Sequence, residues 1–102
     1  MDYDEPLIQF VRTEAYEDWY WRLRDRRARE MINARLRRFQ RGNPGDVRHV
    51  GGGVSELRIH YGPGYRVYYL QRGCEVVILL AGGDKSTQRS DIARALELAR
   101  TV

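Results

Sequence analysis

Cysteine, lysine and long hydrophobic runs are scarce in this sequence of 102 residues. Cys74 is its only cysteine, which excludes an intrachain disulfide and a zinc site built from several thiolates, and we expect a cytoplasmic protein. The longest apolar run, Val76 to Ala81, is far shorter than the roughly 18 to 20 residues of a membrane-spanning helix. The acidic start lacks the basic segment of a signal peptide, so neither secretion nor membrane insertion is predicted.

The length and composition predict a single folded domain spanning residues 1–102. Hydrophobic residues make up 42% and charged residues 31% of the chain, values that are typical of globular domains and argue against disorder or low complexity. A domain of this size buries only about 60 to 68% of the surface of its unfolded chain. We therefore expect one small core and no separate catalytic lobe.

Positive charge is concentrated in one segment. Arginine accounts for 17 of the 18 basic residues, and the formal net charge is +4. Nine arginines lie in residues 22–41, where Asp25 and Glu30 are the only acidic residues. Such a segment favours an anionic partner. The alternative is a solvated helix face whose partner, if any, is an acidic protein. The candidate nucleic-acid contacts in this segment are Arg26, Arg27, Arg37, Arg38 and Arg41.

The first part of the chain predicts a strand and a helix. Leu7 to Arg12 is a short apolar strand candidate, and Thr13 is a helix N-cap candidate because its side-chain oxygen can accept a hydrogen bond from the first turn. A stripe at helical spacing follows: Tyr16, Trp19, Tyr20 and Leu23. We expect this stripe to pack in the core, and stacking on nucleic-acid bases is the alternative.

A second helix is predicted to begin at Asp25 and to end before the Gly- and Pro-containing residues 42–45. Glycine tolerates the left-handed conformation that ends helices, and proline cannot continue the hydrogen-bond ladder. With the three glycines at positions 51–53, we interpret residues 42–53 as a connection rather than an element. The apolar face of the helix is predicted to consist of Ala28, Ile32, Leu36 and Phe39.

The second half of the chain predicts three strands and a last helix. The strands are Ser55–Tyr61, Tyr65–Leu70 and Glu75–Ala81, and their alternation and short turns are typical of an antiparallel meander. The third contains the unbroken apolar run 76–80, so we expect a central strand that is covered on both sides and pairs with the N-terminal strand. Ser86 is the N-cap candidate of the last helix, which should end near Arg100. The order of elements predicts an α+β fold with helices packed on an antiparallel sheet.

Polar residues of the first hairpin form a candidate anion-binding patch. If the strands pair symmetrically about Pro63, Arg58 lies across from Tyr68 and His60 across from Arg66, with all four side chains on one sheet face. Two guanidinium groups so close together repel each other unless an anion lies between them. A phosphate would fit, because it binds the guanidinium fork with two oxygens. The alternative is a solvated sheet face with scattered cations.

Longer stretches of the sequence resemble a known family. SELRIHYGPGYRVYY (Ser55 to Tyr69), followed by VVILLAGGDKSTQRSDIARA (Val76 to Ala95), is similar to the RelE/ParE superfamily of type II toxins and, within it, to the HigB-like branch called addiction module killer proteins. The similarity includes DRRAR (25–29) and GNPGDV (42–47), so it covers nearly the whole chain. It implies a RelE-like fold.

The resemblance implies a toxin that a cognate antitoxin neutralises and that cleaves mRNA in the ribosomal A site without a metal or other cofactor. The 2′-hydroxyl of the RNA attacks the adjacent phosphorus, so the protein must position that hydroxyl and stabilise the added charge. Arg66, Arg58 and Lys85 match the basic positions of the family. His60 is the better candidate base, because arginine stays protonated. Where relatives carry a tyrosine near the end, this chain has Asp91, so either Asp91 or Tyr68 would take that role.

Two other functions remain open at this point. A ParE-like toxin would inhibit DNA gyrase, although the retained Arg58, Arg66 and Lys85 argue against it. An inactive module of the same fold would only bind an antitoxin or RNA. The expected partners are a helix-turn-helix antitoxin, the ribosome and mRNA, with no membrane and with DNA contacted only through the antitoxin complex.

Overall fold

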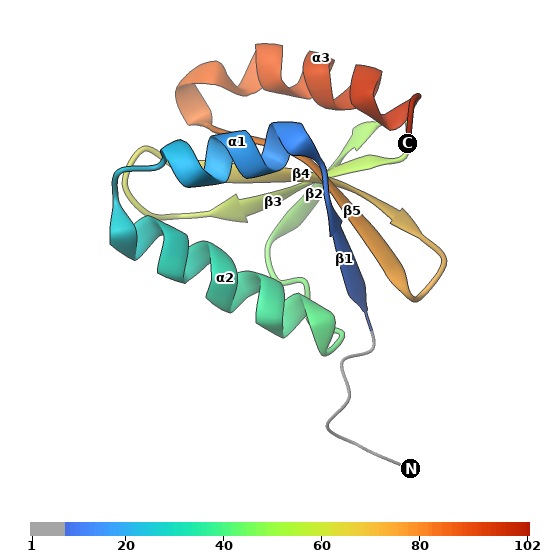
Figure 1. The fold of residues 1–102 in the computed structure, drawn as a ribbon, viewed down its shortest axis with the longest axis horizontal. Coiled ribbons are helices and arrows are strands. Elements are labelled where there is room, and N and C mark those ends of the chain that lie inside the picture. The colour runs from blue at the N-terminus through green and yellow to red at the C-terminus, as the bar shows by residue number, and fades with distance from the viewer. Residues whose placement is uncertain (1–7) are drawn as a thin grey trace.

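A computed structural model describes residues 8–102 of the chain, which form a five-stranded sheet with helices on both faces (Figure 1). The strand order is β1-β5-β4-β3-β2; β1 is parallel to β5 and the other neighbours are antiparallel. The α+β fold is therefore confirmed. The elements are β1 (Gln9–Arg12), α1 (Glu14–Arg22), α2 (Arg26–Gln40), β2 (Val47–Gly51), β3 (Val54–Ile59), β4 (Tyr65–Arg72), β5 (Val76–Asp84), a 3₁₀ turn (Lys85–Thr87) and α3 (Gln88–Ala99).

Both predicted N-caps of the first two helices are present. The hydroxyl of Thr13 accepts a hydrogen bond from the backbone N–H of Tyr16 (3.1 Å) and donates one to the carbonyl of Leu80 (2.7 Å). This hydroxyl therefore both starts α1 and attaches it to β5. Asp25 accepts hydrogen bonds from the backbone of Arg27 (3.0 Å) and Ala28 (3.2 Å) at the start of α2. None of the helices in residues 8–102 is long and apolar enough to cross a bilayer.

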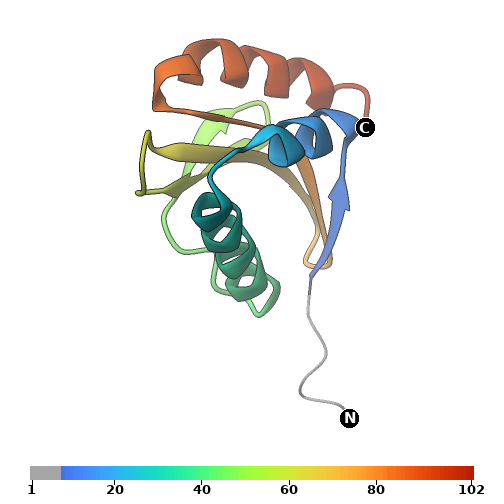
Figure 2. The same ribbon diagram turned by 60° about the vertical axis from the view of Figure 1, so that its left-hand side comes forward.

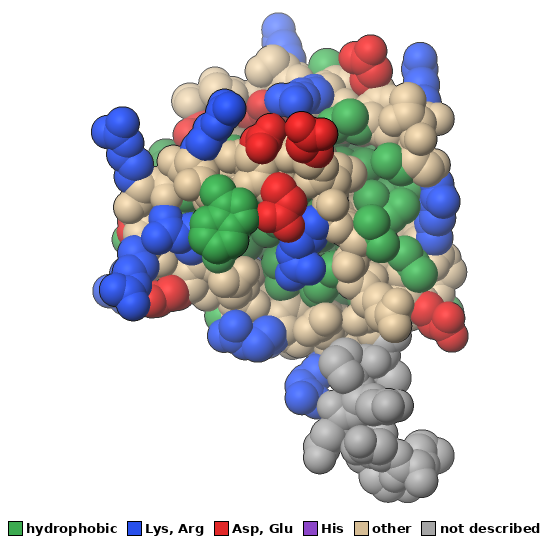
Figure 3. Space-filling model, viewed as in Figure 1, with side chains coloured by type: hydrophobic (Ala, Val, Ile, Leu, Met, Phe, Trp, Pro, Cys, Tyr) green, Lys and Arg blue, Asp and Glu red, His purple; other side chains and the backbone are tan. Residues whose placement is uncertain are grey.

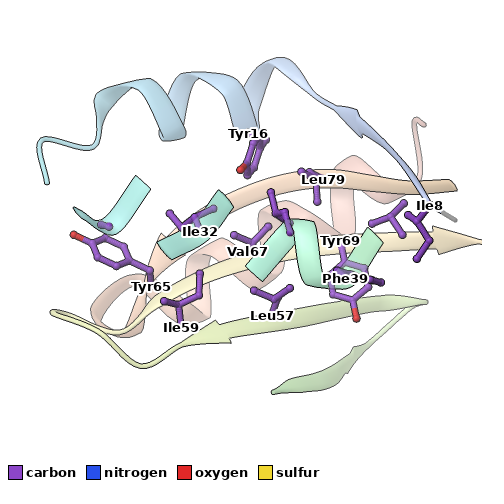
Figure 4. Packing of buried hydrophobic residues seen from close by; sticks show 13 residues of the cluster. Ile8, Tyr16, Ile32, Phe39, Leu57, Ile59, Tyr65, Val67, Tyr69 and Leu79 are labelled. Carbon is purple, nitrogen blue, oxygen red and sulfur yellow. The ribbon is translucent and has the colours of Figure 1, made fainter. Parts of the chain in front are cut away.

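The main core lies between the sheet and helices α1 and α2 (Figure 4). The predicted apolar face of α2 is buried, and Tyr16 of α1 is 1% exposed. The other three members of the aromatic stripe, Trp19, Tyr20 and Leu23, are half-buried against the same core. The stripe is thus used for packing, as expected. A second, smaller core lies between the sheet and α3, which is on the opposite side of the sheet from α2 (Figure 2).

The prediction that residues 42–53 form only a connection is wrong, because β2 lies within them. β2 pairs with β3 at the edge of the sheet, and its pairing is interrupted between His49 and Gly51. Val47 packs against the core beneath α2 and Val50 against the core beneath α3, so the two valines of the strand do not share a face. The alternation that identifies a strand is therefore missing from the sequence.

The predicted register of the β3–β4 hairpin is also wrong. The ladder is symmetric about Gly62 rather than Pro63, so Arg58 lies opposite Arg66 and not opposite Tyr68. The backbone N–H of Gly64 donates to the carbonyl of Tyr61 (3.0 Å), and Gly64 has a φ of 80°. This positive φ, which glycine adopts at little cost, closes the turn one residue earlier than expected. His60 lies beyond the paired residues.

At its C-terminal end, β5 is longer than expected, and the start of the last helix differs. β5 extends to Asp84, whose side chain accepts hydrogen bonds from the backbone N–H and hydroxyl of Ser86 (2.8 and 2.5 Å). Asp84, not Ser86, therefore caps the 3₁₀ turn that leads into α3. The predicted pairing of β5 with the N-terminal strand is confirmed. Leu7, the expected first residue of that strand, lies outside the described residues.

Candidate functional site

A cationic cavity of about 580 Å³ lies where the β3–β4 turn meets the 3₁₀ turn before α3. Three arginines and one lysine line it, and His60 adds an imidazole. A cavity with this lining suits a phosphate or another anion. The lining residues are Arg48, Arg58, His60, Tyr61, Gly62, Pro63, Gly64, Arg66, Lys85 and Gln88.

The structure brings Arg58, Arg66 and Lys85 together from three segments of the chain. Arg58 and Arg66 are direct cross-strand partners, so their side chains leave the same face of the sheet. A Cβ atom built on Gly64 would lie 3.4 Å from both Arg66 Nη1 and Lys85 Cβ. The glycine at this position thus lets the turn approach both cations closely.

Asp46, just before β2, fixes the conformation of two of the lining side chains. Its Oδ1 accepts hydrogen bonds from Arg58 Nη2 (2.7 Å) and Nε (3.2 Å), and its Oδ2 lies 2.5 Å from His60 Nε2. The hydrogen bonds from Arg58, followed by that from His60, lower the pKa of Asp46 to about 2. The same contact raises the pKa of Arg58. Asp46 is therefore an anion at neutral pH.

The contact with Asp46 also determines which nitrogen of His60 can act as a base. An ionised carboxylate only accepts hydrogen bonds, so in neutral His60 the proton is on Nε2 and the lone pair is on Nδ1. Asp46 itself is held by Arg35 of α2. The guanidinium of Arg35 donates to the carbonyls of Arg58 (2.5 Å), Pro44 (3.0 Å) and Asp46 (3.3 Å). One of the nine clustered arginines thus has a structural role.

Tyr68 and Asp91 do not line the cationic cavity. Tyr68 is fully buried beneath α3, and burial, followed by the charge of Glu56, raises the pKa of its phenol well above the usual value. Asp91 lines a separate cavity of about 490 Å³ between α1, β5 and α3, where its Oδ2 accepts a hydrogen bond from the hydroxyl of Thr87 (2.5 Å). Of the six predicted catalytic residues, the other four line the cavity.

The five predicted nucleic-acid contacts are exposed on α2 and at its C-terminal cap. Arg27 lies beside the cavity lining: its guanidinium is 6.0 Å from the ring centre of Tyr61, a lining residue. Arg26 forms an exposed ion pair with Glu30 (3.6 Å). Figure 3 shows Lys and Arg side chains projecting from the α2 side of the molecule and also around α3, while acidic side chains gather over α1. The basic surface and the cavity therefore adjoin through Arg27.

Sequence reasoning missed four polar residues of the site: Asp46, Arg48, Glu56 and Gln88. Asp46 could have been found from GNPGDV (42–47), because an acidic residue directly before an edge strand can reach the cations of the next strand. Arg48 was hidden by the unrecognised β2. Glu56 and Gln88 are joined by a hydrogen bond of 2.6 Å between β3 and α3, a long-range contact with no local signal. Residues 8–102 contain no group of three or more His, Cys, Asp or Glu arranged to hold a metal ion.

Comparison with known proteins places most of the chain in one family. Residues 20–101 match the family described as "Phage derived protein Gp49-like (DUF891)". An uncharacterized protein of Haemophilus influenzae is 48% identical over 95 residues, which cover 93% of this chain and 96% of that protein. The family match includes both strands that carry the paired arginines, the 3₁₀ turn with Lys85, and α3. The chain therefore belongs to the Gp49-like family of phage-derived proteins.

Proposed function

We propose that this protein is the toxin of a type II toxin–antitoxin system and cleaves mRNA on the ribosome. The observation that carries the proposal is the convergence of Arg58, Arg66 and Lys85, with Arg48, on one cavity beside His60. The resemblance to HigB-like toxins, which covers the same residues, supplies the reaction class. Membership of the Gp49-like family is compatible with this assignment.

The cavity residues fit the charge changes of the proposed reaction. The 2′-oxygen of a ribose forms a bond to the adjacent phosphorus, and the bond from phosphorus to the 5′-oxygen of the next nucleotide breaks. Negative charge grows on the phosphate oxygens, and fixed guanidinium groups stabilise it best when they are already in place. Arg66 and Arg58 are held by protein contacts, whereas Lys85 is exposed and adjustable.

His60 is the proposed base for this reaction. With Nε2 bonded to Asp46, Nδ1 would take the proton from the 2′-hydroxyl, and Asp46 would stabilise the imidazolium that forms. The proton on the departing 5′-oxygen comes from a protonated group or from water. Exposure of His60 on the cavity rim leaves room for an RNA strand to reach it.

The proposed partners are the ribosome with mRNA, and a helix-turn-helix antitoxin that neutralises the toxin. The exposed arginines of α2 and its C-terminal cap would contact ribosomal RNA phosphates, because they lie on the surface that adjoins the cavity. They are Arg26, Arg27, Arg37, Arg38 and Arg41.

The test is an mRNA cleavage assay with translating ribosomes and purified protein. We expect cut message with the wild type, and about 100-fold slower cutting by Arg66→Ala, the scale seen when one charge-stabilising donor is removed. Lys85→Ala, which changes an exposed side chain, should also slow cutting, whereas Arg89→Ala on α3 should not. Intact message from the wild type would contradict the proposal, and cleaved DNA in a parallel gyrase assay would identify a gyrase poison instead.

A further inference from the structure

A buried polar cluster lies behind the cationic cavity, and no step of the proposed reaction uses it. Glu56 of β3 is completely buried and Arg66 of β4 is 6% exposed. Glu56 Oε1 lies 3.6 Å from Arg66 Nε, and Glu56 Oε2 accepts a hydrogen bond of 2.6 Å from Gln88 Nε2. Tyr68 is the cross-strand partner of Glu56. A carboxylate is thus buried between a strand of the cavity and the first residue of α3.

Unpaired polar atoms concentrate in this cluster. Within residues 8–102, three buried side-chain atoms have no hydrogen-bond partner from that part of the chain: Glu56 Oε1, Arg66 Nε and Tyr68 Oη. Buried polar groups are normally paired, so three neighbouring exceptions call for a reason. Glu56 Oε1 and Arg66 Nε form an ion pair of 3.6 Å, just beyond hydrogen-bond length, so a small shift of either side chain lets Nε–H donate to Oε1.

The other two nitrogens of Arg66 differ in their contacts with the protein. Nη1 donates to the carbonyls of Gly64 (3.0 Å) and Tyr65 (3.2 Å). With Nε directed at Glu56 and Nη1 at the turn, Nη2 is the nitrogen left for a ligand. A guanidinium is planar and rigid, so fixing two of its nitrogens fixes the direction of the third.

We propose that Glu56 is a positioning residue, whose side-chain acceptor holds the guanidinium of Arg66 so that Nη2 faces the phosphate in the cavity. The same carboxylate binds Gln88, which follows directly on the 3₁₀ turn that carries Lys85. One buried side chain therefore sets the place of two of the cavity cations. The proposal rests on the proposed function only in assigning a phosphate to Arg66.

The experiment separates the acceptor of Glu56 from its charge and its volume. Glu56→Gln keeps an acceptor for Nε and removes the charge, because the amide of Gln88 can turn to match the new side chain. Glu56→Met keeps the length and removes the acceptor. Val54→Ala, a buried change on the same strand and face without contact to Arg66, is the control for lost stability.

The readout is the ¹⁵Nε–Hε signal of Arg66 in a titration with inorganic phosphate. We expect wild type, Glu56→Gln and Val54→Ala to show similar, slow Hε exchange, and Glu56→Met to show exchange at least ten-fold faster. Phosphate should bind Glu56→Gln more tightly than the wild type, because a negative charge behind Arg66 is gone. In the mRNA assay, only Glu56→Met should lose ten-fold or more in kcat.

Wild-type exchange in Glu56→Met would overturn the proposal, and so would equal loss in Glu56→Gln and Glu56→Met. If Glu56→Met does not fold, Gln88→Ala is the second variant. It removes the hydrogen bond that Gln88 donates to Glu56 Oε2, so the carboxylate is no longer held in place beside Arg66 Nε. Faster Hε exchange in Gln88→Ala supports the proposal and unchanged exchange overturns it. The phosphate titration needs no RNA cleavage. An inactive wild type with the expected Hε pattern would thus refute the proposed function alone.

Discussion

The two arginines that the β3–β4 hairpin contributes to the candidate site each form an ion pair with a different carboxylate. Arg58 is paired with half-buried Asp46 on the rim, and Arg66 with fully buried Glu56 behind the cavity. A long, flexible cation loses side-chain entropy when a ligand orders it, and a carboxylate already in place reduces that loss. The same carboxylates also weaken the electrostatic attraction between the arginines and an anionic ligand. For the proposed function, this arrangement would favour a defined phosphate geometry over tight binding.

Replacing Asp46 by Asn gives a pH-dependent change in stability. The carboxyl pKa falls from 3.8 to about 2 in the folded protein, first because of the hydrogen bonds from Arg58 and then because of that from His60. A lowered carboxyl pKa stabilises the folded state above the unfolded-state pKa, and this contribution disappears as the pH falls through the folded-state pKa. The wild type should therefore be more stable than Asp46→Asn at pH 7, and the difference should shrink between roughly pH 4 and pH 2.

Urea unfolding of both proteins from pH 7 to pH 2 measures that difference. Glu97→Gln, which changes an exposed carboxylate on α3, is the control and should stay close to the wild type throughout. A gap between wild type and Asp46→Asn that keeps the same size down to pH 2 would show that the charge of Asp46 is not responsible.

At the scale of elements, two adjacent glycines near the end of β5 leave room for α1 and α3 to pack closely against the strand. A Cβ atom on Gly82 would lie 2.1 Å from the Trp19 ring of α1, and one on Gly83 would lie 1.8 Å from Asp91 Oδ2 of α3. Successive residues of a strand face opposite sides of the sheet, so each glycine serves one helix. Both helices can therefore pack directly on the strand that leads to Lys85.

Gly83→Ala is expected to destabilise the fold by about 1 to 3 kcal/mol, the usual cost of forcing an extra carbon into a packed site. Because the clash is with the Asp91 carboxylate, the same substitution should cost less in an Asp91→Ala background. Urea midpoints of the wild type, the two single variants and the double variant form the cycle. Additive effects would mean that Asp91 is not the group that excludes a side chain at position 83.

The helices were predictable because their signals are local: Thr13 and Asp25 cap α1 and α2 as expected. The hairpin register was not, since it depends on which residue centres the turn. Arg58 and Arg66 were still expected on one face, because a register shift of two residues leaves every side chain on its original face. The burial of Glu56 was not predictable either. Its burial depends on α3, which packs there through contacts that no local pattern reveals.

On the scale of the whole molecule, the position of positive charge matters more than its total. The formal net charge of +4 is modest, yet exposed arginines line α2 and continue toward the cavity through Arg27 and Tyr61. A basic surface that leads to a cationic cavity would guide a polyanion along a path instead of merely attracting it. Two charge reversals on this path should therefore have a larger effect than two elsewhere.

Arg37→Glu/Arg38→Glu tests this path against Arg89→Glu/Arg100→Glu, which makes the same change in net charge at exposed positions in and after α3. Each lost phosphate contact lowers the slope of log affinity against log salt by about 0.7 to 0.9. We expect the α2 pair to weaken ribosome binding and flatten that slope by about 1 to 2, and the α3 pair to leave it nearly unchanged. Equal flattening by both pairs would mean that net charge, rather than the α2 surface, governs the encounter. Binding of the antitoxin is the second readout. If the α2 pair loses ribosome binding and keeps antitoxin binding, α2 is the RNA-facing surface.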